Sequence, residues 1–230
     1  MTVYGAELVR AESEEEAASI VADALVEAAR AGRAIVLTGG HTPGRAYELA
    51  AEREPDWSAA SVLWGDERCV PPEDERSNYR LAREHLLDRL EAQPREVQRI
   101  HGELEPAEAA DEYEAVLRGV HLDLMLLGLG PDAHAASLFP GSPALEERER
   151  LVVATEAGLE PFVDRVTMTL PALSSAPDML FIVTGEDKAE AVERAFGRPP
   201  DPAAPGSMVR SATGRTRLVT DIPAASRLHP

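Results

Sequence analysis

The chain of 230 residues is long enough to bury a full hydrophobic core, and a single α/β domain over residues 1–230 is expected at this length. It has no apolar run of about 18 residues and only one cysteine, Cys69, which excludes a transmembrane helix, a disulfide framework and a thiolate metal cluster. The net charge of −18 argues against nucleic acid as a partner, and the polar N-terminus lacks a signal peptide, so a soluble cytoplasmic protein is expected, with no membrane partner.

The N-terminal part predicts a helix and then a buried strand. Residues 13–30 carry apolar side chains at helical spacing, and Ser13 with Glu16 matches a capping box. After Gly32, residues 34–37 form a short apolar run, as in a strand buried on both faces of a parallel sheet. Both elements are expected to be scaffold.

The sequence TGGHTP follows this strand and predicts a tight turn at the N-terminus of a helix. Thr42 is expected as the N-cap and Pro43 as the first helical residue. Free N–H groups and the helix dipole favour an anion at such a place. Because no Walker motif or dinucleotide fingerprint is present, a single phosphate is predicted to contact Gly39, Gly40, His41 and Thr42; the alternative is an ordinary strand–helix turn.

The next strand is predicted at residues 61–64, and charged residues follow directly. Asp66, Glu67 and Arg68 lie just past its end, on the same rim as the glycine turn if the sheet is parallel. Further elements are expected as a helix from Ser77 to Leu90, a connection with a short strand near Ile100, and a helix over residues 105–118.

Residues 122–127 predict a buried strand, with a buried helix segment as the alternative, and lead into the loop that carries the most reactive side chains. Asp132 and His134 place a carboxylate and an imidazole two residues apart, where ligands bind in open α/β sheets. Ala135 is expected to begin a short helix whose free N–H groups face the same cleft. The alternative is a solvated surface histidine.

The C-terminal half continues the alternation of strands and helices. Lys188, the only lysine of the chain, falls in the first turn after a buried strand. A compact ammonium kept in an arginine-rich chain suggests a local site for an anion; the alternative is a residue left over from a compositional bias. The elements are expected as strands over 151–154, 179–183 and 216–220, a half-exposed strand or an extended segment over 165–170, helices over 185–196 and 221–228, and a loop over 197–206. The whole pattern predicts an α/β, three-layer αβα fold with a mostly parallel central sheet.

Four segments, spread along the chain, carry the polar residues described above: TGGHTP, WGDERCVPPEDERSNYR, LGLGPDAHAASLFPG, and RVTMTLPAL followed by TGEDKAE. In this order and spacing they resemble the 6-phosphogluconolactonase family, within the wider glucosamine-6-phosphate isomerase/lactonase superfamily, over residues 32–221. The resemblance implies a Rossmann-like fold, no cofactor or metal, and hydrolysis of 6-phosphoglucono-δ-lactone to 6-phosphogluconate in the pentose phosphate pathway. The oligomeric state stays open, and a monomer is compatible with the sequence.

The resemblance also assigns site residues. The family's catalytic histidine falls on His134 and its partner aspartate on Asp132, while Asp66 and Arg68 match the GDER motif. Its sugar-phosphate contacts fall on Gly39, Gly40, His41, Thr42, Arg165 and Lys188.

Three positions depart from the family pattern. Ala133 and Ala135 replace glycine and threonine of D-G-H-T-A-S, and His41 stands where serine is common. At Ala133 the loop either needs no positive φ or tolerates some strain. At His41 the imidazole either supplies a donor to the phosphate or points away.

The expected mechanism is hydrolysis of an ester by activated water. Histidine suits this task because its ordinary pKa lies near 6.5, so neutral His134 accepts a proton from water and returns it to the ring oxygen. Asp132 orients the ring; Asp66 is a second candidate for this role, or binds sugar hydroxyls. Arg68 either stabilises the oxyanion or binds phosphate. No G-x-S-x-G serine is present, which argues against an acyl-enzyme.

Other functions fit the sequence less well. Glucosamine-6-phosphate deaminases carry Asp-Glu-Tyr at the place of Asp66-Glu67-Arg68, and a glutamate in the segment after the residue that matches His134. The arginine of this chain therefore favours the lactonase over the deaminase. A non-catalytic sugar-phosphate sensor would need a basic DNA-binding helix-turn-helix, for which this acidic chain has no room. Nicotinamide binding through Gly128-Leu129-Gly130 lacks the third glycine.

Overall fold

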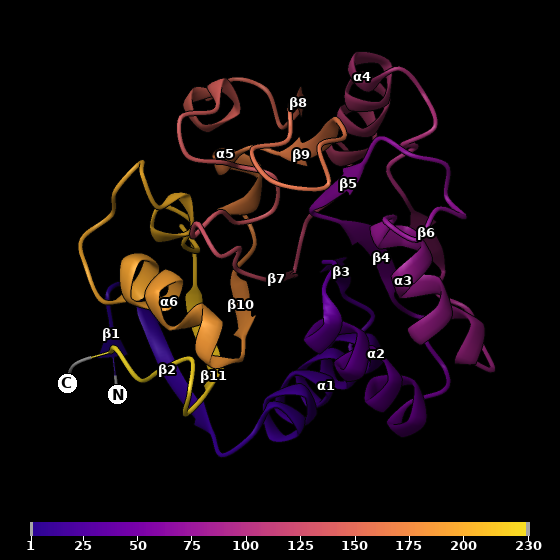
Figure 1. The fold of residues 1–230 in the computed structure, drawn as a ribbon. Helices are drawn as coiled ribbons and strands as arrows, with labels where there is room; N and C mark the ends of the chain where they lie inside the picture. Colours follow the sequence, from indigo (N-terminus) through magenta and orange to yellow (C-terminus); the bar gives the residue numbers. More distant parts are fainter. Residues whose placement is uncertain (1, 229–230) are drawn as a thin grey trace.

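Eight strands form the central sheet of the computed structural model, which describes residues 2–228 (Figure 1). Their order is β1-β2-β11-β10-β7-β3-β4-β6, and neighbours run parallel except β1 and β2. A small sheet of order β5-β9-β8 is antiparallel. The central strands are β1 Thr2–Val3, β2 Ala6–Ala11, β3 Ala34–Leu37, β4 Ser61–Trp64, β6 Glu96–Gln98, β7 Leu124–Leu127, β10 Asp178–Val183 and β11 Arg215–Asp221. The small sheet holds β5 Asp66–Arg68, β8 Val152–Thr155 and β9 Arg165–Met168.

Helices lie on both sides of the central sheet. In Figure 1, α1 and α2 lie below strands β7, β3 and β4, and α4 with the small sheet lies above them. The helices are α1 Glu14–Arg30, α2 His41–Arg53, α3 Asn78–His85, α4 Pro106–Leu117, α5 Leu170–Leu173 and α6 Ala189–Phe196. Four short 3-10 turns are η1 Leu87–Arg89, η2 Pro143–Glu146, η3 Glu186–Lys188 and η4 Pro205–Ser207. The predicted αβα class with a mostly parallel sheet is therefore confirmed.

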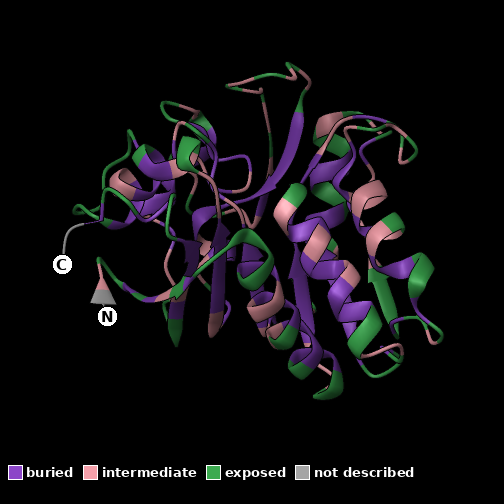
Figure 2. Ribbon diagram, turned by 60° about the horizontal axis from the view of Figure 1, so that its bottom comes forward, coloured by how far each residue is buried: buried purple, intermediate pink, exposed green. Residues whose placement is uncertain are grey.

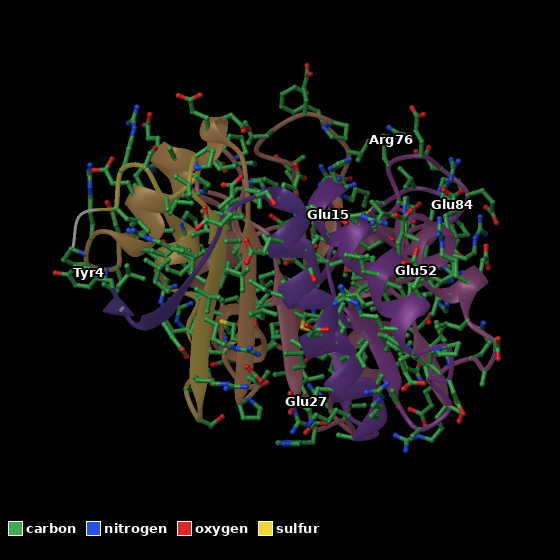
Figure 3. The ribbon with its side chains drawn as sticks, turned by 90° about the horizontal axis from the view of Figure 1, so that it is seen from below. Tyr4, Glu15, Glu27, Glu52, Arg76 and Glu84 are labelled. Carbon is green, nitrogen blue, oxygen red and sulfur yellow. The ribbon has the colours of Figure 1, made fainter. Side chains whose placement is uncertain are left out.

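Burial follows the apolar runs of the sequence. Every residue of β3, β4 and β7 is buried, as expected for strands covered on both faces (Figure 2). Charged side chains such as those of Glu15, Glu27 and Glu52 project from the outer faces of α1 and α2 (Figure 3). Within residues 2–228, no helix combines the length and apolarity needed to cross a bilayer.

The first helix begins as its sequence predicts. The Ser13 hydroxyl accepts a hydrogen bond from the Glu16 N–H at 3.2 Å. The Glu16 carboxylate returns its bond to the N–H of Glu12 at 2.7 Å, one residue before the position of a regular capping box. This end of α1 is thus fixed by both side chains.

Several expectations about local structure are wrong. Helix α2 begins at His41 with Gly40 as its N-cap, so Thr42 and Pro43 lie inside the first turn; Gly40 has a φ of 114°, which lets the chain turn earlier. No helix follows Ala135, because the next residue has a φ of 49° and the segment closes in a bridge to Leu138.

The ends of the chain and of one helix also differ from the expectation. Residues 222–227 form turns rather than a helix, and helix α3 ends at His85, before the separate turn η1. The strand expected near Ile100 is β6, two residues earlier. Strands β1, β2 and β5 were not predicted, because their polar residues mask any apolar run.

Arg210 holds the segment after α6 against the N-terminal strands. Its guanidinium donates to the carbonyl oxygens of Tyr4, Ala195 and Gly206 at 3.1, 2.7 and 2.8 Å. Methionine would leave these carbonyls without a donor, so Arg210→Met is expected to lower the free energy of unfolding by about 2–4 kcal/mol. Denaturant unfolding measures this change. Arg198→Met, at a mostly exposed arginine, is the control and should cost less than about 1 kcal/mol; equal effects would contradict the assignment.

Candidate active site

A cleft of about 720 Å³ opens where the central parallel strands end. Its walls come mainly from the loops after β3, β7 and β10, together with strand β5 and the first residue of β9. Carboxyl ends of parallel strands share one edge of a sheet, which is why loops far apart in sequence meet here. The cleft is lined by these predicted site residues: Gly39, Gly40, His41, Thr42, Asp66, Arg68, His134, Arg165 and Lys188.

Asp132 lies behind the His134 ring. Its Oδ1 is 2.6 Å from Nδ1 of His134 and accepts the backbone N–H of the same residue at 3.1 Å. A carboxylate can only accept, so it holds the proton on Nδ1 and leaves Nε2 free to accept another. Burial alone would raise the pKa of Asp132, but the hydrogen bonds and charge of His134 outweigh it and lower this pKa.

Two neighbours fix the orientation of this imidazole. The ring of Phe139 lies 4.6 Å from it, centroid to centroid. On Gly130, a Cβ would lie 2.0 Å from Nδ1 of His134, so only glycine leaves room for the ring there. The side chain of His134 is 22% exposed, enough for its free edge to meet a ligand.

The loop around His134 has a strained backbone. Ala133 and Ala136 have φ of 68° and 49°, in the left-handed region that favours glycine. Of the two alternatives for Ala133, the loop therefore requires positive φ and tolerates the strain. Such strain is typical of segments that hold reactive groups in a defined position.

Asp66 belongs to the opposite wall and does not hold the imidazole. Its Oδ2 accepts the hydroxyl of Ser137 at 2.6 Å, and its Oδ1 accepts the amide of Asn78 at 3.2 Å. Sequence reasoning missed both partners. Asn78 stands directly after Ser77, the first residue of the predicted helix and the N-cap of α3 in the structure, but nothing in the sequence tells that this end of the helix reaches the cleft.

Arg68 and Arg165 lie side by side in the small sheet, as directly opposed residues of β5 and β9. Arg165 is 4% exposed; its Nη2 donates to the carbonyl of Pro161 at 3.0 Å, and its buried Nη1 has no partner among the described residues. Burial and the charge of Arg68 lower the pKa of Arg165. Two paired cations are unfavourable unless an anion lies between them.

Lys188 reaches the cleft from the end of β10. Its Nζ donates to the carbonyl of Leu129 at 2.9 Å, in the loop that also carries His134. Burial lowers the pKa of Lys188, against the charges of Asp187 and Asp132. A partly buried ammonium with one neutral partner has donors left for a ligand.

The glycine turn packs closely against the opposite wall. A Cβ on Gly39 would lie 2.0 Å from the side-chain oxygen of Asn78. Thr42 donates its hydroxyl to Glu14 at 2.9 Å and lies 2.8 Å from the hydroxyl of Thr184. His41 is 91% exposed, with Nδ1 3.1 Å from Glu14, so its ring lies at the solvated rim of the cleft.

Carboxylates and imidazoles of the described residues include no group of three or more arranged to hold a metal ion. The cleft brings the cations Arg68, Arg165 and Lys188 together with His134, whose imidazole is paired with Asp132. This set can bind an anion and move a proton.

Comparison with known proteins agrees with this chemistry. A family model for glucosamine-6-phosphate isomerases/6-phosphogluconolactonase matches residues 9–218. The chain is 38% identical to the 6-phosphogluconolactonase of Homo sapiens over 212 residues, covering 87% of this chain and 82% of that protein. It is 34% identical to the 6-phosphogluconolactonase of Streptomyces coelicolor over 222 residues, covering 88% and 84%. The structure of 6-phosphogluconolactonase from Trypanosoma cruzi matches with a TM-score of 0.88 at 25% identity, covering 100% of this chain and 99% of that one. The chain belongs to the glucosamine-6-phosphate isomerase/6-phosphogluconolactonase family.

Proposed function

We propose that the protein hydrolyses 6-phospho-D-glucono-1,5-lactone to 6-phospho-D-gluconate, with His134 as the general base. The observation that carries the proposal is the 2.6 Å contact of Asp132 with Nδ1 of His134, at the wall of a cleft that Arg68, Arg165 and Lys188 also line. The names of the relatives support the same reaction. The cleft volume of about 720 Å³ suits a small sugar phosphate.

In the proposed reaction, His134 moves one proton. Its Nε2 accepts a proton from water while the water oxygen bonds to the lactone carbonyl carbon. The bond from that carbon to the ring oxygen then breaks, and the ring oxygen takes the proton from Nε2. The open-chain acid releases its carboxyl proton to solvent. Asp132 keeps Nδ1 protonated and stabilises the imidazolium that forms between the two steps.

The cations of the cleft are assigned to the phosphate. Arg68 and Arg165 stand as direct neighbours, and a dianion between them would offset their repulsion. Lys188 adds an ammonium at the loop of His134, and the N-terminus of α2 adds free N–H groups from its glycine turn. Because the protein carries a net charge of −18, this local cluster must overcome the overall repulsion of an anion.

The test is the rate of acid release from freshly made lactone, corrected for its spontaneous opening. Turnover well above the spontaneous rate is expected, and no ammonia should be released from glucosamine 6-phosphate. Ammonia release without acid release from the lactone would overturn the proposal in favour of the deaminase reaction.

A further inference from the structure

The two walls of the cleft are joined through one buried carboxylate. On one side, the hydroxyl of Ser137, which belongs to the loop of His134, donates a hydrogen bond to Oδ2 of Asp66 at 2.6 Å. From the other side, the amide of Asn78 donates to the backbone carbonyl of Asp66 at 2.9 Å and to its carboxylate at 3.2 Å. Ser137, Asp66 and Asn78 are 2%, 7% and 2% exposed, so water competes little for these bonds.

The loop of His134 needs such an anchor. Ala133 and Ala136 have left-handed backbone that alanine disfavours, and such backbone persists only where its surroundings stabilise it. One stabilising contact is the hydrogen bond that the Gly206 N–H donates to the carbonyl of Ala133 at 2.7 Å. Ser137 supplies two more, through its hydroxyl to Asp66 and through its N–H to Thr167 Oγ1 at 3.2 Å.

The far end of this link is fixed as well. Glu67 is 2% exposed and accepts the N–H groups of Asn78 and Tyr79, both at 2.8 Å, and the hydroxyl of Ser77 at 3.0 Å. These bonds hold the first turn of α3. The amide of Asn78 therefore meets Asp66 from a rigid position.

We propose that Ser137 is a positioning residue for His134, and that Asn78 holds the carboxylate on which Ser137 is anchored. The role in turnover rests on the proposed lactonase function. Loss of the Ser137 hydroxyl removes one of the three bonds that stabilise the strained loop, three residues from the imidazole. Arg68, Arg165 and Lys188 make no bond to this hydroxyl, so the proposed phosphate ligands are not altered directly. The structure thus gives Asp66 the role of an anchor between the two walls.

The kinetic test compares Ser137→Ala and Asn78→Ala with the unaltered protein. Both are expected to lower kcat for the lactone about 10- to 100-fold, with KM within about threefold, because small displacements of a reacting group are costly. Ser142→Ala is the matched control: its hydroxyl lies 2.9 Å from Thr155 Oγ1, outside the cleft, and kcat should stay unchanged. Two variants are used so that a failure of one to fold does not end the test.

A second readout needs no substrate. In ¹⁵N-labelled protein, the ring nitrogens of His134, assigned by comparison with His134→Gln, should show one tautomer with the proton on Nδ1. Ser137→Ala is expected to broaden these signals or populate the other tautomer, below its unfolding temperature. A role confined to stability would leave them unchanged.

The outcomes separate the two proposals. If the unaltered protein shows no lactone turnover, the proposed function fails and the ring signals alone decide the positioning role. Lower kcat together with altered ring signals supports it. Unchanged ring signals overturn it, whatever the kinetics. A raised KM with unchanged kcat also overturns it and makes the Ser137–Asp66 pair a substrate contact.

Discussion

Replacing His134 by alanine is expected to lower kcat for the lactone by about 10²- to 10⁴-fold, the usual contribution of a positioned acid–base group. The affinity for 6-phosphogluconate should stay within about threefold, because the proposed phosphate ligands lie elsewhere in the cleft. Initial rates of acid release, corrected for spontaneous opening, measure kcat, and isothermal titration with the product measures affinity.

The control for this variant is His101→Ala. His101 pairs with Glu112 at 2.5 Å and does not line the cleft, so its loss should leave both values unchanged. Full turnover by His134→Ala would remove the imidazole from the mechanism. A large loss of product affinity with unchanged kcat would instead make His134 a binding residue.

The scaffold was predictable where burial and sequence pattern coincide. Residues 34–37 and 61–64 are apolar or small, wholly buried, and form β3 and β4 with the expected bounds. Glycine turns and charged residues follow such strands at once, and parallel strands bring those loops to one edge. The sequence pattern therefore predicts that Asp66, His134 and Lys188 share one cleft.

The small antiparallel sheet of β5, β9 and β8 could not be predicted from local sequence pattern. The pairing of β5 with β9 joins residues about a hundred positions apart, and it alone makes Arg68 and Arg165 neighbours. Periodicity reports which face of an element is buried, not which distant segment covers it. Ser137 was missed for the same reason, since its partner Asp66 lies 71 residues away.

Backbone strain explains the errors inside the site. Alanine favours helices, so the segment after His134 was expected to be helical. The structure holds Ala133 and Ala136 at positive φ through contacts from other elements, which outweigh that preference. Tertiary contacts override local propensity most often at sites that must hold reactive groups.

Lys188→Met is expected to raise KM for the lactone about 10- to 100-fold, with kcat changed less than about threefold. Loss of a charge-assisted hydrogen bond to phosphate has this size. In the ligand-free protein the same change should leave the free energy of unfolding within about 1 kcal/mol, because the lost bond to the carbonyl of Leu129 is offset by relief of a partly buried charge. Steady-state kinetics and denaturant unfolding measure the two effects.

The pH dependence of KM is a second test of whether Lys188 binds the phosphate. Burial lowers the pKa of Lys188, so the folded protein releases this proton at lower pH than an ordinary lysine, and phosphate binding should weaken as pH rises through that value. The alkaline rise in KM is expected to vanish in Lys188→Met. Arg227→Met removes an exposed cation, 55% exposed and paired with Glu190 at 3.6 Å, and controls for net charge. If KM in Lys188→Met equals that of the control, the lysine does not bind the phosphate.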